Sequence, residues 1–337
     1  MPGQRSVTLR FLAAPTDANV RGLVGAGKVL EWIDKAGYAA AVAWAGTYCV
    51  TAYVGNIHFT RPVNVGDLVE VQGRVVFTGR TSLQVVCTVS SGDPRDEGMV
   101  VNTQCMLQFV AMREGKPVEV PSFTPRDEWE AAEHERAGRL NAARREIEAD
   151  MSRQTYSHNT EACRETLRFL AAPTDVNWGG KVHGGYVMNW IDQAASVVAT
   201  RWHGGQAVAV YAGGVRFYRP MFIGDLVEVE ARLIYTGFSS MHISVHVRSG
   251  DPQTRELRET THCTFVYVAL DDEGRKRRVK SWNPQLPEDI DLQEHAKTMI
   301  DIRERLLRTL PDAAPPDPGL RLWPTVPGAE EQGEPPK

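Results

Sequence analysis

The stretch LRFLAAPTDAN at residues 9–19 returns almost unchanged as LRFLAAPTDVN at residues 167–177. The separation between the two copies then holds without a gap, so that GDLVEV at residues 66–71 is repeated at 224–229. A period this long indicates two globular units, because the repeats of a solenoid or propeller run to roughly 20–50 residues. The 337-residue chain is therefore predicted to contain a duplicated domain.

Both copies predict the same sequence of elements. A long helix is expected at residues 28–44 and again at 186–202, where bulky apolar residues recur at helical spacing. Strands are expected at 47–60, 68–77, 82–91 and 100–112, and in the second copy at 207–218, 226–235, 241–249 and 260–270. One long helix followed by a run of antiparallel strands predicts an α+β fold, with the helix packed on one face of the sheet.

Changes in composition predict the domain boundaries. The N-terminal domain is expected at 1–124, a charged helical linker at 125–160, the C-terminal domain at 161–283, and a helix with a tail at 284–337. The linker is charged and nearly free of Pro and Gly, which is typical of a solvated helix. The end of the tail is rich in Pro and acidic residues and is predicted to be disordered.

The composition excludes several classes of protein. A formal net charge of -4 offers no basic surface for nucleic acid. Neither a signal peptide nor an apolar run long enough for a membrane span is recognised, so a cytoplasmic location is expected. Five cysteines without a C-x-x-C pair indicate a reduced protein. His242, His246 and His262 fall on predicted strands without metal-like spacing, so no metal ligand is assigned.

A glycine turn at residues 22–28, GLVGAGK, has the glycine and lysine spacing of a Walker A loop. The next residue, Val29, lacks the hydroxyl with which such a loop binds magnesium. In the second copy the turn reads GGKVHGG at 179–185, with its lysine ahead of the final glycines. The turn is therefore not predicted to bind nucleotide phosphates.

Asp34 and Asp192 occupy the same position in the two predicted helices, among small apolar residues. A carboxylate there is costly to bury unless it has partners or a use, and burial would raise its pKa and suit it to act as a general base on water. The structural alternative is a helix aspartate that reaches solvent or a backbone N–H. Its presence in both copies, while the nearby Glu31 changes to Asn189, favours a functional role.

Gly184 and Gly185 open the second helix directly after His183. The first N–H groups of a helix lack partners within it, and its dipole favours negative charge there, as an oxyanion site requires. A plain tight turn into the helix is the structural alternative. Gly25 replaces His183 in the first copy, so a role for the histidine is limited to one site.

The motifs APTDVN, KVHGG, WID, RFYRP, GD and TGFSS, in this order, resemble the acyl-CoA thioesterases of the hotdog fold, in particular the double-hotdog type and its single-domain bacterial relatives. The resemblance covers residues 5–120 and 163–280. It implies tandem hotdog domains, each a long central helix wrapped by a curved antiparallel sheet, which pair to form composite sites. It also implies hydrolysis of acyl-CoA to a free acid and CoA, no cofactor besides the CoA of the substrate, and assembly of several chains into a homo-oligomer.

The same resemblance implies the site residues. Asp34 would face the turn of His183, Gly184 and Gly185, and Asp192 would face the corresponding turn of the first copy; the aspartate is the general base or nucleophile and the turn amides hold the oxyanion. The positions implied for substrate binding are Gly25, Gly27, Asn19, Asn177, Arg80, Ser82, Ser239 and Ser240. The last four belong to TGRTS and TGFSS, for which plain hairpin turns are the alternative. The Asp34 site is favoured because its facing turn keeps the histidine, and the alternative is that Asp192 is the working carboxylate.

Two other functions stay open on the sequence. A hotdog hydratase or dehydratase would act on enoyl thioesters, but such relatives generally pair the aspartate with a histidine on the segment entering the helix, and the first copy lacks one. A non-catalytic acyl-CoA sensor would need a partner domain, which the charged linker and tail do not resemble.

Overall fold

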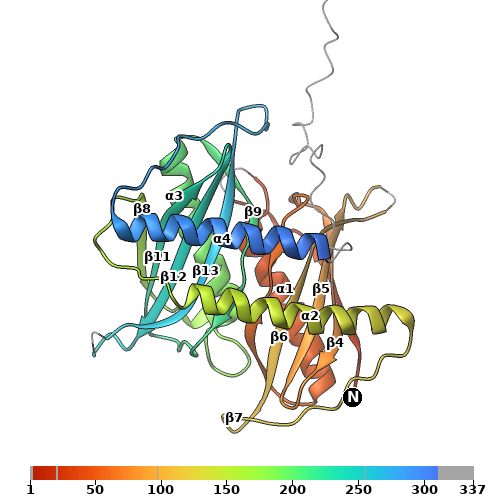
Figure 1. The fold of residues 1–337 in the computed structure, drawn as a ribbon. Helices are drawn as coiled ribbons and strands as arrows, with labels where there is room; N and C mark the ends of the chain where they lie inside the picture. The colour runs from red at the N-terminus through yellow and green to blue at the C-terminus, as the bar shows by residue number, and fades with distance from the viewer. Residues whose placement is uncertain (1–2, 20–21, 97, 255, 310–337) are drawn as a thin grey trace, which may run out of the picture.

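The computed structural model describes residues 3–309 except 20–21, 97 and 255 (Figure 1). The predicted disordered tail, from residue 310 onward, lies outside the described residues. No helix in this described part is long and apolar enough to cross a membrane.

Each repeat contains one long helix and a series of strands, and each is followed by one further helix. The first repeat forms β1 (Ser6–Leu12), η1 (Pro15–Asp17), α1 (Ala26–Ala45), β2 (Cys49–Val54), β3 (Ile57–His58), β4 (Leu68–Thr78), β5 (Ser82–Gly92), β6 (Val100–Arg113) and β7 (Lys116–Pro117). The second forms β8 (Arg164–Leu170), η2 (Pro173–Asp175), α3 (Gly184–His203), β9 (Gln206–Ala212), β10 (Val215–Phe217), β11 (Leu226–Thr236), β12 (Ser240–Gly250) and β13 (Arg258–Leu270). The helices α2 (Glu128–Met151) and α4 (Pro287–Thr309) follow the two repeats. The α+β class is confirmed, and β1 and β8 are strands that the sequence analysis did not identify.

The strands of both repeats form one antiparallel sheet. Along its main path the order is β1-β4-β5-β6-β2-β10-β13-β12-β11-β8. The two repeats join through β2 with β10 and through β3 with β9, where Val54 faces Val215 and Ile57 faces Ala212. These two junctions are equivalent under exchange of the repeats, so the halves of the chain are related by approximate twofold symmetry.

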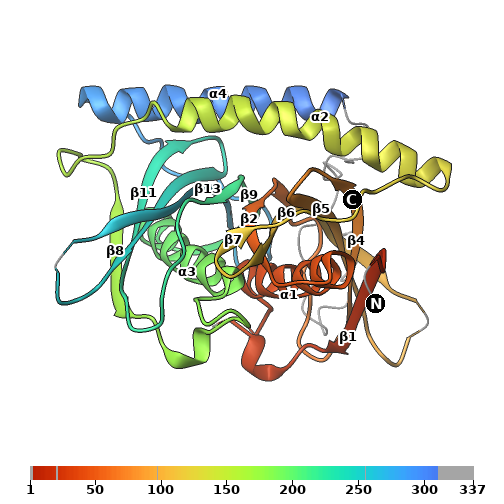
Figure 2. The same ribbon diagram turned by 90° about the horizontal axis from the view of Figure 1, so that it is seen from below.

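Helices cover the sheet on both sides. Figure 2 shows α1 and α3 on one side of the sheet and α2 and α4 on the other. The helices α1 and α3 share a core with the strands, because Leu30 and Ile33 of α1 and Met188 and Ile191 of α3 belong to one buried apolar cluster. Burying apolar surface contributes roughly 25 cal/mol per Å², so this shared core helps to hold the two repeats together.

The helix α2 differs from the prediction of a solvated connecting helix. It lies across the sheet, buries Ala137 and Ile147, and holds the buried Glu130 2.7 Å from Arg5 of the first repeat. The sequence does not predict this contact, because the few buried apolar side chains of α2 lie among charged residues and do not form a continuous apolar stripe.

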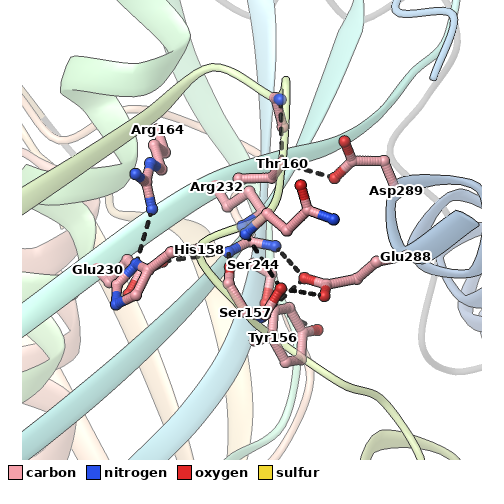
Figure 3. Close-up of polar contacts among 12 residues, drawn as sticks. Tyr156, Ser157, His158, Thr160, Arg164, Glu230, Arg232, Ser244, Glu288 and Asp289 are labelled. Carbon is pink, nitrogen blue, oxygen red and sulfur yellow. Dashed lines mark hydrogen bonds and ion pairs between the residues drawn. The ribbon is translucent and has the colours of Figure 1, made fainter. Parts of the chain in front are cut away.

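The segment between α2 and β8 docks on the start of α4 through a polar network (Figure 3). Arg232, only 2% exposed, donates to Glu288 Oε1 at 2.7 Å, and the Ser157 N–H donates to the same oxygen at 2.7 Å. Beside it, the Thr160 hydroxyl donates to Asp289 at 2.6 Å. The two acidic residues lie in the first turn of α4, where the helix dipole favours negative charge.

Candidate active site

Among the cavities in the described part of the chain, two contain one of the repeated aspartates each, and both are lined by residues of the two repeats. The Asp34 pocket has a volume of about 390 Å³ and includes Asp34 and Thr51 from the first repeat with Asn177, His183 and Gly184 from the second. The Asp192 pocket has a volume of about 480 Å³. Its lining includes Asp192 and Tyr267 of the second repeat with Asn19, Gly25 and Lys28 of the first.

The Asp34 carboxylate is held at both oxygens. Asp34 is 2% exposed, on the face of α1 that meets α3. The Gly185 N–H donates to its Oδ2 at 2.8 Å, and the Thr51 hydroxyl of β2 donates to its Oδ1 at 2.7 Å. These bonds offset the cost of burying the carboxylate and fix its orientation at the wall of the cavity.

The N-terminus of α3 points at this carboxylate. His183 is the N-cap residue, and its Nδ1 accepts from the Gly185 N–H at 3.0 Å and lies 3.1 Å from Asp34 Oδ2. In the described part of the chain, the Gly184 N–H donates to no protein group, as is usual in the first turn of a helix. A Cβ at Gly184 would lie 3.0 Å from Asp34 Oδ2, so glycine permits the close approach of helix and carboxylate. The Gly184 amide is therefore the donor that this turn leaves open to a bound group.

The Asp192 carboxylate repeats part of this arrangement. The Gly27 N–H of α1 donates to its Oδ2 at 2.9 Å. Its second oxygen accepts from the Tyr267 hydroxyl of β13, which also lies 3.0 Å from the backbone oxygen of the same aspartate. Burial raises the pKa of Asp192 despite these two hydrogen bonds, which act in the opposite direction. No side chain caps α1 at Gly25, the position equivalent to His183.

Thr51 and Tyr267 are the site residues that the sequence analysis missed. Both place a hydroxyl on an aspartate Oδ1, from different strands of the two repeats. The position equivalent to Thr51 is Ala209, and the position equivalent to Tyr267 is Phe109. Comparison of the repeats identifies only residues that both copies contain. It therefore did not identify these two hydroxyls, each of which is present in one copy.

The structure brings together most of the predicted site residues. Asp34 meets the His183–Gly185 turn, Asp192 meets the turn at Gly25 and Gly27, Asn177 lines the Asp34 pocket, and Asn19 lines the Asp192 pocket. Four residues line neither pocket and belong to the β4–β5 and β11–β12 hairpins: Arg80, Ser82, Ser239 and Ser240. Their contact with CoA stays a prediction.

At the junction of the two α+β repeats, each repeat supplies one carboxylate and one helix N-terminus. Each carboxylate contacts the helix N-terminus of the other repeat. The thioesterase superfamily model matches residues 22–97 and 179–256, once in each repeat. Protein VdlD of Helicobacter pylori is 30% identical over 139 residues, which cover 41% of this chain and 79% of that protein. The chain belongs to the thioesterase superfamily.

Longer relatives match both repeats. Mouse acyl-coenzyme A thioesterase 11 is 25% identical over 83% of this chain and 50% of its own length. Human cytosolic acyl coenzyme A thioester hydrolase is 25% identical over 80% of this chain and 76% of its own length. The chain thus spans half of the first relative and about three quarters of the second.

A solved structure shares the fold. The structure described as a putative oleoyl thioesterase from Lactobacillus plantarum superimposes with a TM-score of 0.57, covering 79% of this chain and 97% of that one. The two sequences are 11% identical, so this likeness concerns the fold alone. Together with the two family matches, it identifies the hotdog thioesterase fold.

Proposed function

We propose that the chain hydrolyses acyl-CoA thioesters to a free acid and CoA, and that the Asp34 pocket is the working site. The observation that carries this proposal is a buried carboxylate, held by Thr51 and Gly185, beside the open amide of Gly184 in a cavity of about 390 Å³. The names of the mouse and human relatives support acyl-CoA as the substrate class.

The proposed reaction uses Asp34 as general base. Asp34 removes a proton from a water molecule while the water oxygen attacks the thioester carbonyl carbon. The carbonyl oxygen becomes negative and accepts a hydrogen bond from the Gly184 N–H, at the positive end of the α3 dipole. When the C–S bond breaks, the CoA thiolate takes the proton from Asp34. Direct attack by Asp34 is the alternative route: the C–S bond breaks, CoA thiolate leaves and an anhydride forms. Water then hydrolyses the anhydride to the free acid and the Asp34 carboxylate, and the thiolate takes up the proton that is released.

We further propose that the two repeats are tandem hotdog domains, each of which supplies the carboxylate of one composite site and the helix N-terminus of the other. The Asp34 site has the histidine cap, and its carboxylate oxygens are held by the Gly185 amide and the Thr51 hydroxyl. In the Asp192 pocket no side chain caps α1 at Gly25, and the second oxygen of the carboxylate accepts from the Tyr267 phenol instead of a threonine hydroxyl. These differences favour Asp34 over Asp192.

Release of free thiol from short-, medium- and long-chain acyl-CoAs tests the proposal. Asp34→Asn is expected to lower kcat by roughly 10²–10⁴-fold, the usual contribution of a general base, and to keep the native circular dichroism spectrum. Asp192→Asn, the matched control in the other pocket, is expected to retain activity.

The other outcomes are equally informative. Loss of activity in Asp192→Asn alone would move the working site to the second pocket. Binding of acyl-CoA to the wild type without release of thiol would replace the hydrolase with a sensor. Hydration of an enoyl-CoA at an intact thioester bond would identify the hydratase alternative.

A further inference from the structure

A pair of histidines lies buried on the outer face of the second repeat, away from both pockets. His246 of β12 and His262 of β13 face each other directly across the two strands, and their rings stack with centroids 3.8 Å apart. His246 is 6% exposed and His262 is 3% exposed. Neither ring nitrogen of His246 has a hydrogen-bond partner in the described part of the chain. A buried polar group without a partner is rare and calls for a physical explanation.

A β-bulge brings a carboxylate to the same place. Val247 pairs with Thr261, but Arg248 pairs with Glu259, so Thr260 is an extra residue in β13. The bulge moves Glu259 onto the face that carries the two histidines, where an unbroken strand would alternate. Glu259 Oε1 lies 3.5 Å from His246 Nδ1. One ligand atom from each of His246, Glu259 and His262 lies within 4.8 Å of the other two.

The first repeat provides an internal comparison. It has the same bulge, but the positions equivalent to His246, Glu259 and His262 hold Thr88, Val101 and Gln104. There the Gln104 amide donates to the Thr88 hydroxyl at 3.1 Å and accepts from Arg136 at 3.2 Å. The first repeat therefore satisfies its polar groups internally, whereas the second leaves the nitrogens of His246 unused.

We propose that His246, His262 and Glu259 form a binding site for one Zn²⁺ ion per chain. Two imidazole nitrogens and a carboxylate oxygen are a ligand set that Zn²⁺ accepts, at distances of about 2.0–2.2 Å. Rotations of the His246 and Glu259 side chains that bring their ligand atoms toward His262 would supply that geometry, with water completing a tetrahedral shell. Within the described residues this is the one group of three such side chains close enough to bind an ion.

Neighbouring groups fit this role. The Ser244 hydroxyl lies 3.0 Å from His262 Nε2 and 3.0 Å from the Tyr156 hydroxyl, which fixes the orientation of the ring as outer-shell partners of metal ligands do (Figure 3 shows Tyr156 and Ser244). The Tyr156 ring lies 4.0 Å from that of His246. Because the Glu259 side chain is 45% exposed, an ion has a route from solvent.

Calorimetric titration of the full chain with zinc sulfate, after treatment with a chelator and removal of the chelator, tests the site. The wild type is expected to bind one Zn²⁺ at a saturable site and to gain thermal stability on binding. Glu259→Gln, at a partly exposed position, is expected to weaken the affinity by about tenfold or more while the protein stays folded. His246→Gln is expected to abolish the site.

Two matched controls complete the experiment. His242→Gln removes another buried histidine of β12 outside the group, and Glu256→Gln removes a neighbouring exposed carboxylate; both are expected to bind zinc as the wild type does. No saturable zinc binding by the wild type would overturn the proposal. So would unchanged binding in Glu259→Gln, even if His246→Gln fails to fold. Because thiol release is measured separately, failure here leaves the hydrolase proposal standing.

Discussion

The two pockets share their aspartate and glycine motifs but differ at single residues. Thr51 and Tyr267 each donate to an aspartate Oδ1, yet one is a short hydroxyl on β2 and the other a phenol on β13. The aspartates and glycine turns were predictable because both repeats carry them. The hydroxyls were not, because their positions are close to the aspartates only after distant strands pair.

Removing the Thr51 hydroxyl tests its role at the residue scale. Thr51→Val keeps the shape of the side chain but takes one hydrogen bond from the buried Asp34 carboxylate. A hydrogen bond to a charged group contributes about 1.5–3 kcal/mol, so kcat is expected to fall by roughly 10–100-fold. Steady-state thiol release measures the change.

Tyr267→Phe is the matched control, since it removes the equivalent hydroxyl from Asp192 and installs the residue type found at Phe109. It is expected to leave kcat unchanged. The assignment of the working site would be wrong if Tyr267→Phe lost activity and Thr51→Val kept it.

At the scale of elements, the start of each central helix touches the backbone of the other. A Cβ at Gly185 would lie 2.7 Å from the Cα of Glu31 in α1, and a Cβ at Gly27 would lie 2.7 Å from the Cα of Asn189 in α3. Neither neighbour is a flexible side-chain end, so the helices themselves must move to admit a methyl group. The glycines were predictable as a turn, whereas this contact between helices was not.

Gly185→Ala is therefore expected to lower the free energy of unfolding by about 1–3 kcal/mol, the usual cost of overpacking. Urea denaturation followed by circular dichroism measures the loss. Gly138→Ala in α2 is the control, because a Cβ there meets nothing within 4 Å. That variant is expected to gain up to about 1 kcal/mol from helix propensity, and equal effects in the two variants would contradict the packing argument.

Apolar periodicity in the sequence predicted some of these elements and missed others. The central helices and the long strands were predicted within a few residues, because apolar spacing is strong there. The strands β1 and β8 were missed although Val7, Leu9 and Phe11 alternate with polar residues along β1. These short strands pair with β4 and β11, which lie much later in the chain.

At the scale of the whole molecule, histidines kept neutral in the fold make stability depend on pH. Burial, aided by Arg303, lowers the pKa of His58 to about 4 and that of His242 to about 3, from an ordinary value of 6.5. Below about pH 6.5 the unfolded chain binds protons that the folded chain excludes, so stability is complete above that pH and falls as the pH decreases. The expected loss approaches 1.4 kcal/mol per pH unit for each histidine.

Urea denaturation at several pH values between about 7.5 and 5 measures this slope, above the range in which ordinary carboxylates titrate. A double variant, His58→Gln with His242→Gln, is expected to show a weaker dependence over the same interval. A wild-type stability that stayed constant from pH 7.5 to 5 would contradict the assignment of neutral histidines.

Joining the repeats in one sheet has an evolutionary consequence. If two separate one-repeat chains formed the same twofold junction, a single gene would encode both sites, and every substitution would alter them together. In the present chain, the paired strands β2 and β10 are encoded by different segments of one gene. His183 and Gly25 can therefore differ without conflict, as can Thr51 and Ala209. If the Asp34 pocket is the working site, as proposed, duplication relieves the Asp192 site of selection for turnover. Its helix N-terminus and carboxylate still contact each other across the junction.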